Sequence, residues 1–143
     1  MELLTILAAD YANIAQGGKL NVMGIFRDIN ASSFPAKHLS MTLVIKLAAD
    51  LGEYEERKLI IKLMDSDGNE LMEMAAPIKF PPPVGGKRPE INAILQINEI
   101  VFPKPGRYQF SVFVDKDHKG SLSIDLVQLT PQITVTKTPP EQK

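Results

Sequence analysis

Two apolar runs flank a short polar segment in KLIIKLMDSDGNELMEMAA (Lys58–Ala76), and the interpretation of the whole chain starts from this arrangement. In the first run, Leu59, Ile61 and Leu63 fall on one side of an extended chain, with lysines on the other. A period of two is typical of a strand with one buried and one exposed face. The pair Asp67-Gly68 suits a tight turn, because such a pair readily adopts the positive φ of a primed turn. The stretch therefore predicts a β-hairpin.

The acidic residues of this hairpin raise the alternative of a calcium loop. An EF-hand loop needs oxygen ligands at positions 1, 3 and 5, glycine at position 6 and glutamate at position 12. Counted from Asp65, Gly68 stands at position 4 and Ala76 at position 12. The spacing fails, so we interpret the segment as a turn.

Apolar–polar alternation recurs along the chain, and together with further apolar runs it predicts eight strands. No long window shows the i, i+3, i+4, i+7 spacing of an amphipathic helix, although Asp10 and Gly17-Gly18 could bound a single helical turn. Many short strands without helices indicate two packed sheets or a barrel, and we favour the former. The expected fold is all-β, an antiparallel β-sandwich that is immunoglobulin-like or a close variant, with eight to nine strands. The predicted strands cover residues 3–9, 19–26, 41–49, 58–65, 70–76, 91–98, 107–115 and 121–126.

Composition sets the broad class. The 143 residues suit one domain, and 44% hydrophobic residues suffice for a core. We expect a single domain over residues 1–130 and a C-terminal tail over 131–143, with one further short strand before a disordered end. A net charge of −1 gives no field that would attract nucleic acid or an anionic membrane, so both are excluded as partners. Zero cysteines, no signal peptide and no long apolar run predict a cytoplasmic protein.

Histidine and phosphate-loop patterns bear on catalysis. The two histidines, His38 and His118, fit no metal or triad spacing, and strand counting puts them at opposite ends of the sandwich. Neither Gly-Gly-Lys segment has the spacing of a phosphate loop. The sequence therefore predicts no enzyme, no metal and no cofactor.

Charged loops supply one candidate binding surface. If eight strands alternate in direction, the loops after strands one, three, five and seven share one end, and sandwiches often place function in such loops. The alternative is that these are ordinary solvated charges. The candidate binding residues are Asp10, Tyr11, Asn13, Lys87, Arg88, Asp115, Asp117 and His118.

Outward apolar residues supply a second candidate surface. Contiguous exposed apolar area usually marks an interface, and methionine is common on adaptable binding surfaces. The alternative is that loops or the tail cover this surface. The candidate interface residues are Met23, Ile25, Ile60, Met64, Met72, Met74 and Phe113.

The segment FPKPGRYQF carries a further signal. Pro105-Gly106 is a tight-turn pair that directly precedes a predicted strand. Tyr108 then stands where immunoglobulin-like sandwiches place a tyrosine whose hydroxyl bonds back to nearby backbone. The other interpretation is that Tyr108 is simply a core aromatic, and the sequence leaves both open.

The stretches ADYANIAQGGKLNVMGIFRDI, FP at Phe34-Pro35, DSDG and FPKPGRYQFSVFVD resemble a family of short, uncharacterised bacterial proteins known as a domain of unknown function. The resemblance covers roughly residues 8–128. It implies a bacterial origin and a small all-β fold, and it implies no activity.

The expected function is a non-catalytic protein-interaction or self-associating module, whose partner is another protein or a second copy of itself. The alternative is a calcium- or small-ligand-binding sandwich that uses the acidic loops.

Overall fold

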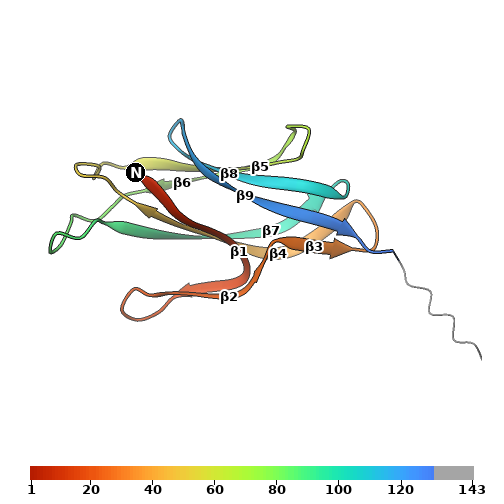
Figure 1. Cartoon of the computed structure of the whole chain (residues 1–143), viewed down its shortest axis with the longest axis horizontal. Helices are drawn as coiled ribbons and strands as arrows, with labels where there is room; N and C mark the ends of the chain where they lie inside the picture. Colours follow the sequence, from red (N-terminus) through yellow and green to blue (C-terminus); the bar gives the residue numbers. More distant parts are fainter. Residues whose placement is uncertain (131–143) are drawn as a thin grey trace, which may run out of the picture.

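The computed structural model describes residues 1–130, and this part of the chain forms nine strands and no helix. An all-β fold is therefore confirmed (Figure 1). The prediction for residues 131–143 lies outside the described residues. The strands are β1 (Glu2–Ile14), β2 (Leu20–Phe26), β3 (Asp28–Ala31), β4 (Ala36–Ala48), β5 (Arg57–Met64), β6 (Glu70–Ile78), β7 (Glu90–Phe102), β8 (Gly106–Val114) and β9 (Asp117–Gln128).

The strands form two sheets. Sheet A has the order β2-β1-β4-β7, and sheet B has the order β3-β9-β8-β5-β6. All neighbouring strands are antiparallel except β3 and β9, which are parallel. In Figure 1, β5, β8 and β9 lie in one layer and β1, β4 and β7 in the other.

The alternating residues of both sheets build one core. Leu59, Ile61 and Leu63 of β5 are at most 1% exposed, as their period of two predicts. They pack in the same cluster as the inward residues of β4, so the two sheets share their buried faces. The largest fully buried side chains are Tyr108, Phe80, Phe102, Phe110, Met41, Leu43, Ile45, Leu47, Leu59, Ile61, Leu63 and Ile124.

In strand β7, the residues that face the core have odd numbers before Glu99 and even numbers after it. Ile97 faces the core before Glu99, whereas Ile100 and Phe102 are buried after it. Glu99 has a φ of 59°, which a non-glycine residue adopts only where the chain turns locally out of the extended conformation. The predicted strand over 91–98 therefore continues to Phe102, and this irregularity hid its last third from a strict alternation pattern.

Strands β1 and β9 approach closely and close one side of the structure. A Cβ atom on Gly120 of β9 would lie 2.5 Å from Leu3 Cδ2 of β1. A larger residue at this position would require the Leu3 side chain to shift, and the positive φ that favours glycine elsewhere is not involved.

The hairpin between β5 and β6 forms as predicted. Asp65 Oδ1 accepts hydrogen bonds from the backbone N–H groups of Asp67 (2.9 Å) and Asn69 (2.8 Å). Only Gly68 takes a positive φ here, 85°, so the turn is not the two-residue primed type, which needs positive φ at both central residues. Within this acidic segment, Asp65 therefore stabilises the loop between β5 and β6.

Two local predictions are wrong. The helical turn between Asp10 and Gly18 is absent, because β1 continues to Ile14 and returns as β2 after a turn at Gly17-Gly18. The segment Asp28–Ala31, expected to be a connection, is strand β3. Four residues are too few for a readable period, and the pairing with β9 is parallel and distant in sequence.

Tyr108 satisfies both interpretations made of it. It is 1% exposed, and its ring meets Phe102 edge-on at a centroid distance of 4.9 Å. Its hydroxyl donates to the carbonyl oxygen of Lys104 at 2.7 Å and accepts from the Lys104 N–H at 3.3 Å. A core aromatic therefore also fixes the turn that leads into β8.

Residues 1–130 contain no helical segment of the length and hydropathy needed to cross a bilayer.

Candidate functional site

One end of the molecule collects charged groups from five places in the sequence. They come from the starts of β1 and β5, the loops after β4 and β6, and the turn after β8. We call this set the charged end. Its members are Met1, Glu2, Asp50, Glu53, Arg57, Arg88 and Asp115.

Arg88 ties three of these segments together. Its Nη1 donates to Glu2 Oε2 at 2.5 Å, its Nη2 to Asp50 Oδ1 at 2.8 Å and its Nε to the Ala49 carbonyl at 2.9 Å. Asp50 also accepts from the Met1 ammonium group. These hydrogen bonds, from the ammonium group first and Arg88 second, lower the pKa of Asp50 to about 2. Arg88, one of the predicted binding residues, thus braces the loop after β6 against the loop after β4.

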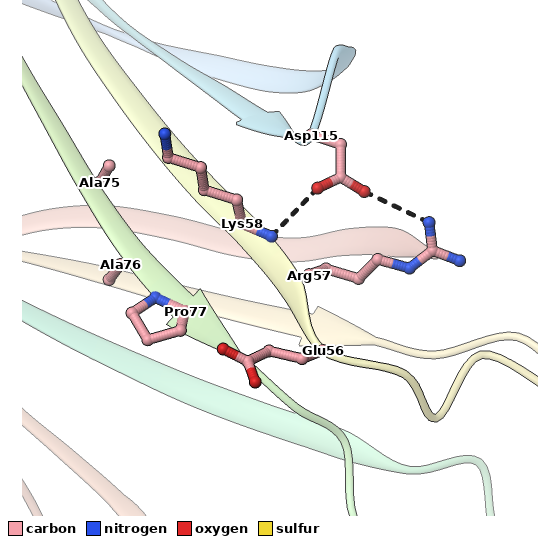
Figure 2. A pocket seen from close by; sticks show the side chains of 7 residues that line it. All are labelled: Glu56, Arg57, Lys58, Ala75, Ala76, Pro77 and Asp115. Atoms are coloured by element: carbon pink, nitrogen blue, oxygen red, sulfur yellow. Dashed lines mark hydrogen bonds and ion pairs between the residues drawn. The ribbon is translucent and has the colours of Figure 1, made fainter.

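Asp115 follows the same principle on the other sheet (Figure 2). It accepts from the Lys58 backbone N–H at 3.1 Å and from Arg57 Nη1 at 3.2 Å. Both bonds lower its pKa, the first more strongly. This ion pair borders a hollow of about 450 Å³. Figure 2 shows Ala75, Ala76 and Pro77 of β6 on the other side of the hollow from Asp115.

A second hollow of about 790 Å³ lies between the loops after β4 and β6. Leu51 and Tyr54 line it, and Lys87 stands beside Arg88 at its rim. Its volume falls in the range of small-molecule sites. No group of three histidine, cysteine, aspartate or glutamate side chains suited to a metal occurs within residues 1–130.

The structure brings only some of the predicted binding residues together. Lys87, Arg88, Asp115 and Asp117 lie at the charged end, as strand counting indicates, and His118 follows Asp117 in β9. His118 stacks edge-on against Phe113 at 5.2 Å.

The prediction that Asp10, Tyr11 and Asn13 share this end is wrong. Strand β1 starts at the charged end, where Glu2 pairs with Ala48, and these three residues lie beyond Ala9, towards the opposite end. The error arises because strand β3 was not predicted. In a count that alternates strand directions, one missing strand reverses the direction of β1 relative to β4 and all later strands. Asp10 packs against the backbone of Gly24, where no Cβ would fit.

The histidines are separated as expected. His38 lies near the start of β4, against Phe26 at 5.9 Å, and His118 lies at the start of β9. Antiparallel pairing puts these two strand starts at opposite ends of the molecule.

The predicted apolar interface does not form one surface. Met72 and Met74 lie opposite Leu63 and Ile61, so they face the core, and the prediction that they face outward is wrong. Because Leu71 and Met72 are adjacent and both apolar, the sequence did not show which set of alternating residues in β6 faces the core. The remaining five residues divide between two sheets, with Ile60, Met64 and Phe113 in sheet B and Met23 and Ile25 in β2 of sheet A.

One apolar cluster does reach solvent, on the β1–β2 hairpin. Tyr11 lies opposite Met23, and Ala9 lies opposite Ile25, so these side chains share a face. Tyr11, Met23 and Ile25 are 54%, 64% and 56% exposed. We call these three residues the hairpin patch. Reading Gly17-Gly18 as a hairpin turn would have revealed the pairing of Tyr11 with Met23.

A polar pair borders the hairpin patch. Asn21 Nδ2 donates to Asn13 Oδ1 at 3.0 Å, and these residues are opposite each other one step further along the same face. Tyr11 and Asn13, predicted as loop residues, thus lie on a strand face beside two predicted interface residues.

Stability at the charged end depends on pH. Because the folded state holds the pKa of Asp50 at about 2, below the ordinary 3.8, it favours folding above about pH 4, and this contribution is lost as pH falls towards 2. We expect Asp50→Asn to lower the melting temperature at neutral pH and to flatten its decline between pH 4 and 2. Calorimetry across that range checks this. Glu55→Gln, in the same loop and outside the ion pairs of residues 1–130, should follow the parent curve.

The comparisons with known proteins can now be added to this geometry. A family described as "Family of unknown function (DUF6941)" matches residues 4–127. The chain belongs to this family. The recognition of an uncharacterised family from sequence is therefore confirmed. No curated protein matches the chain.

Among solved structures, the chain resembles a Pseudomonas fluorescens alkylpurine DNA glycosylase, AlkC, bound to DNA that contains an abasic site analog. The TM-score is 0.45 at 13% identity, and the match covers 85% of this chain and 30% of that one. The predicted exclusion of nucleic acid as a partner is corrected here, because this solved structure is bound to DNA. A likeness this weak makes no statement about what the present chain binds. The bacterial origin, the cytoplasmic location and the exclusion of membranes stay predictions.

Proposed function

We propose that this chain is a non-catalytic protein-interaction module that docks a partner on the hairpin patch. The observation that carries the proposal is that Tyr11, Met23 and Ile25 lie close together on one face of the β1–β2 hairpin. Each of the three side chains is more than half exposed. Large apolar side chains grouped on a surface usually mark an interface. Tyrosine is enriched among the residues that dominate binding energy, and methionine adapts to varied partner shapes.

The partner chemistry follows from the composition of the patch. The centre is apolar and uncharged, and the Asn13–Asn21 amide pair forms a polar border. An apolar core with a polar rim is the usual anatomy of a protein interface. The partner should therefore present apolar side chains at its centre and hydrogen-bonding groups at its rim.

The non-catalytic part of the proposal is supported by how the charged groups are used. Arg88, Asp50 and Asp115 are engaged in bonds that brace loops. The histidines stand at opposite ends, which separates the two side chains most suited to act as a base. The calcium-binding alternative has no specific observation in its favour.

The immunoglobulin-like form of the sandwich belongs to the same proposal. If β4, β5, β7, β8 and β9 are assigned to strands B, C, E, F and G, the neighbours B–E and C–F–G of that fold are reproduced. The hydrogen bonds between Tyr108 and Lys104 support the assignment, because that fold places such a tyrosine at the start of strand F.

The test compares two charge substitutions. Met23→Asp should weaken binding to the partner about tenfold or more, since a carboxylate would be desolvated at the centre of the interface. Leu39→Asp is the matched control, because Leu39 is 70% exposed on β4, outside the patch, and should leave binding unchanged. Partners are captured from the native host with each variant, identified by mass spectrometry, and measured again by calorimetry with purified components.

A partner that binds the parent and Met23→Asp with equal affinity would contradict the proposal. Equal loss with both variants would also contradict it, because the effect would then not be local to the hairpin patch. Thermal melting of each variant confirms that it is folded.

A further inference from the structure

The four sheet edges within residues 1–130 differ in how they are protected. An edge strand presents unpaired backbone N–H and C=O groups, and proteins blunt such edges with short strands, charges or proline. Strand β3 has four residues, and β2 has seven with Gly24 among them. Strand β6 carries Glu70, Glu73 and Pro77. Each of these three edges therefore contains a feature that discourages a further strand.

Strand β7 is less protected, because its two glutamates, Glu90 and Glu99, lie at its first residue and at the irregularity, outside residues 91–98. It is 13 residues long, and its register with β4 runs from Ala48↔Glu90 to Ala36↔Phe102 on one side only. The segment Ile91–Asn98 contains no charge, no proline and no glycine. This edge is long, regular up to Glu99 and chemically open.

The core beside β7 is also incompletely covered. Leu95 faces the core but is only half-buried, because sheet A ends at this strand. Together with Met74 of β6 it lines a small gap between the sheets. Asn92 Oδ1 is buried without a hydrogen-bond donor in the described part of the chain. Both observations indicate an edge that is unfinished in a single copy.

We propose that a second copy of this chain pairs with β7 in an antiparallel, two-fold arrangement that joins the two copies of sheet A into one continuous sheet. The sequence of β7 is self-complementary about Ile94. With Ile94 opposite its own copy, Asn92 faces Gln96, Ala93 faces Leu95, and Ile91 faces Ile97. On the outer face, the amide side chains of Asn92 and Gln96 would be paired across the two copies. On the core face, the small Ala93 would be paired with the larger Leu95.

Charge favours a second copy over an unrelated strand. In this register the end residue Glu90 faces Asn98, so no like charges are opposed along the regular part of the edge. The net charge of −1 adds little repulsion between copies. A two-fold axis lets one patch serve both partners, as in most homodimers. Moving the two-fold axis to Ala93 or Leu95 would place Ile94 opposite an outer amide, so side-chain matching favours the axis at Ile94.

The inference goes beyond the proposed function. Strands β2 and β7 are opposite edges of sheet A, so the hairpin patch and the β7 edge can be occupied at the same time. The two proposals also fail separately, because Met23→Asp should leave the mass in solution unchanged, and substitutions at Ile94 should leave the hairpin patch intact.

Light scattering coupled to size exclusion tests the dimer. The parent should show twice the chain mass of 15.8 kDa. Ile94→Lys and Ile94→Glu should each shift to the single-chain mass, because two like charges would face each other on the two-fold axis. An equimolar mixture of the two variants should restore the double mass. Leu39→Lys, 70% exposed on the neighbouring strand β4, is the control and should stay dimeric.

A cross-link provides a second measurement that does not depend on tolerating a charge. The chain contains no cysteine, so Ile94→Cys introduces the only thiol. Directly opposed residues in antiparallel strands have Cα atoms about 4.5–5.5 Å apart, which suits a disulfide. Mild oxidation should give a covalent dimer with Ile94→Cys and none with Leu39→Cys.

Three results would overturn the inference. The first is a parent chain that keeps the single-chain mass at every concentration. The second is a dimer that persists in folded Ile94→Lys, and the third is a dimer in which Ile94→Cys does not cross-link.

Discussion

Replacing Phe102 with alanine should lower the free energy of unfolding by about 3–5 kcal/mol, the range seen when a buried phenylalanine is truncated. Phe102 is 0% exposed, and its ring meets Tyr108 edge-on at 4.9 Å. Truncation removes the buried apolar area and leaves a cavity where the end of β7 meets the start of β8. Small domains have total stabilities of about 5–15 kcal/mol, so the variant should lose a large share of its stability.

Urea denaturation followed by far-ultraviolet circular dichroism measures this loss. The matched control is Val101→Ala, because Val101 is the adjacent residue of the same strand and is 51% exposed. Its effect should be within about 1 kcal/mol of zero. Comparable losses from both substitutions would show that β7 is not buried on one side at this point.

Removing the hydroxyl group of Tyr108 should cost about 1–3 kcal/mol, because Tyr108→Phe removes two hydrogen bonds to the Lys104 backbone, each contributing about 0.5–1.5 kcal/mol. The hydroxyl donates to the Lys104 carbonyl at 2.7 Å and accepts from the Lys104 N–H at 3.3 Å. The aromatic ring, and hence its packing against Phe102, is retained. The loss therefore reports on the hydrogen bonds that hold the turn before β8.

Tyr11→Phe is the matched control for this second substitution. Tyr11 is 54% exposed, so removing its hydroxyl should change stability by no more than about 0.5 kcal/mol. Denaturant titration of both variants checks the difference. An equal change in the two would mean that the bonds to Lys104 contribute nothing net.

The strands with regular alternation could be predicted from sequence because burial on one face fixes their period. Strand β5 shows this, since every predicted inward residue is buried. The prediction of strands from alternation failed where the alternation was interrupted, too short or ambiguous. Glu99 interrupts the extended conformation of β7, and β3 is too short to show a period. In β6, the adjacent apolar residues Leu71 and Met72 follow Glu70, so either of them could face the core.

The candidate sites were harder to predict, because they depend on how strands pair. Arg88 contacts Asp50 because the loops that carry them lie at the same end of the molecule. Strand counting assigned both loops to that end correctly. The hairpin patch depends on the register Tyr11↔Met23, which the expectation of a helical turn concealed. Missing β3 then reversed the end to which Asp10 and Asn13 were assigned. A single missing strand thus changed the function assigned to residues far from it.

The parallel pairing of β3 with β9 has a consequence for how the chain is made. The register joins Asp28 to Asp125 and Ala31 to Gln128, so most of the polypeptide lies between the two partners. During synthesis from the N-terminus, β3 emerges early and has no pairing partner until β9 leaves the ribosome. Hairpins such as β5–β6 can close while translation continues, since their halves are neighbours in the chain. A nascent chain stalled before β9 would therefore leave β3 without a partner and the edge of β8 uncovered.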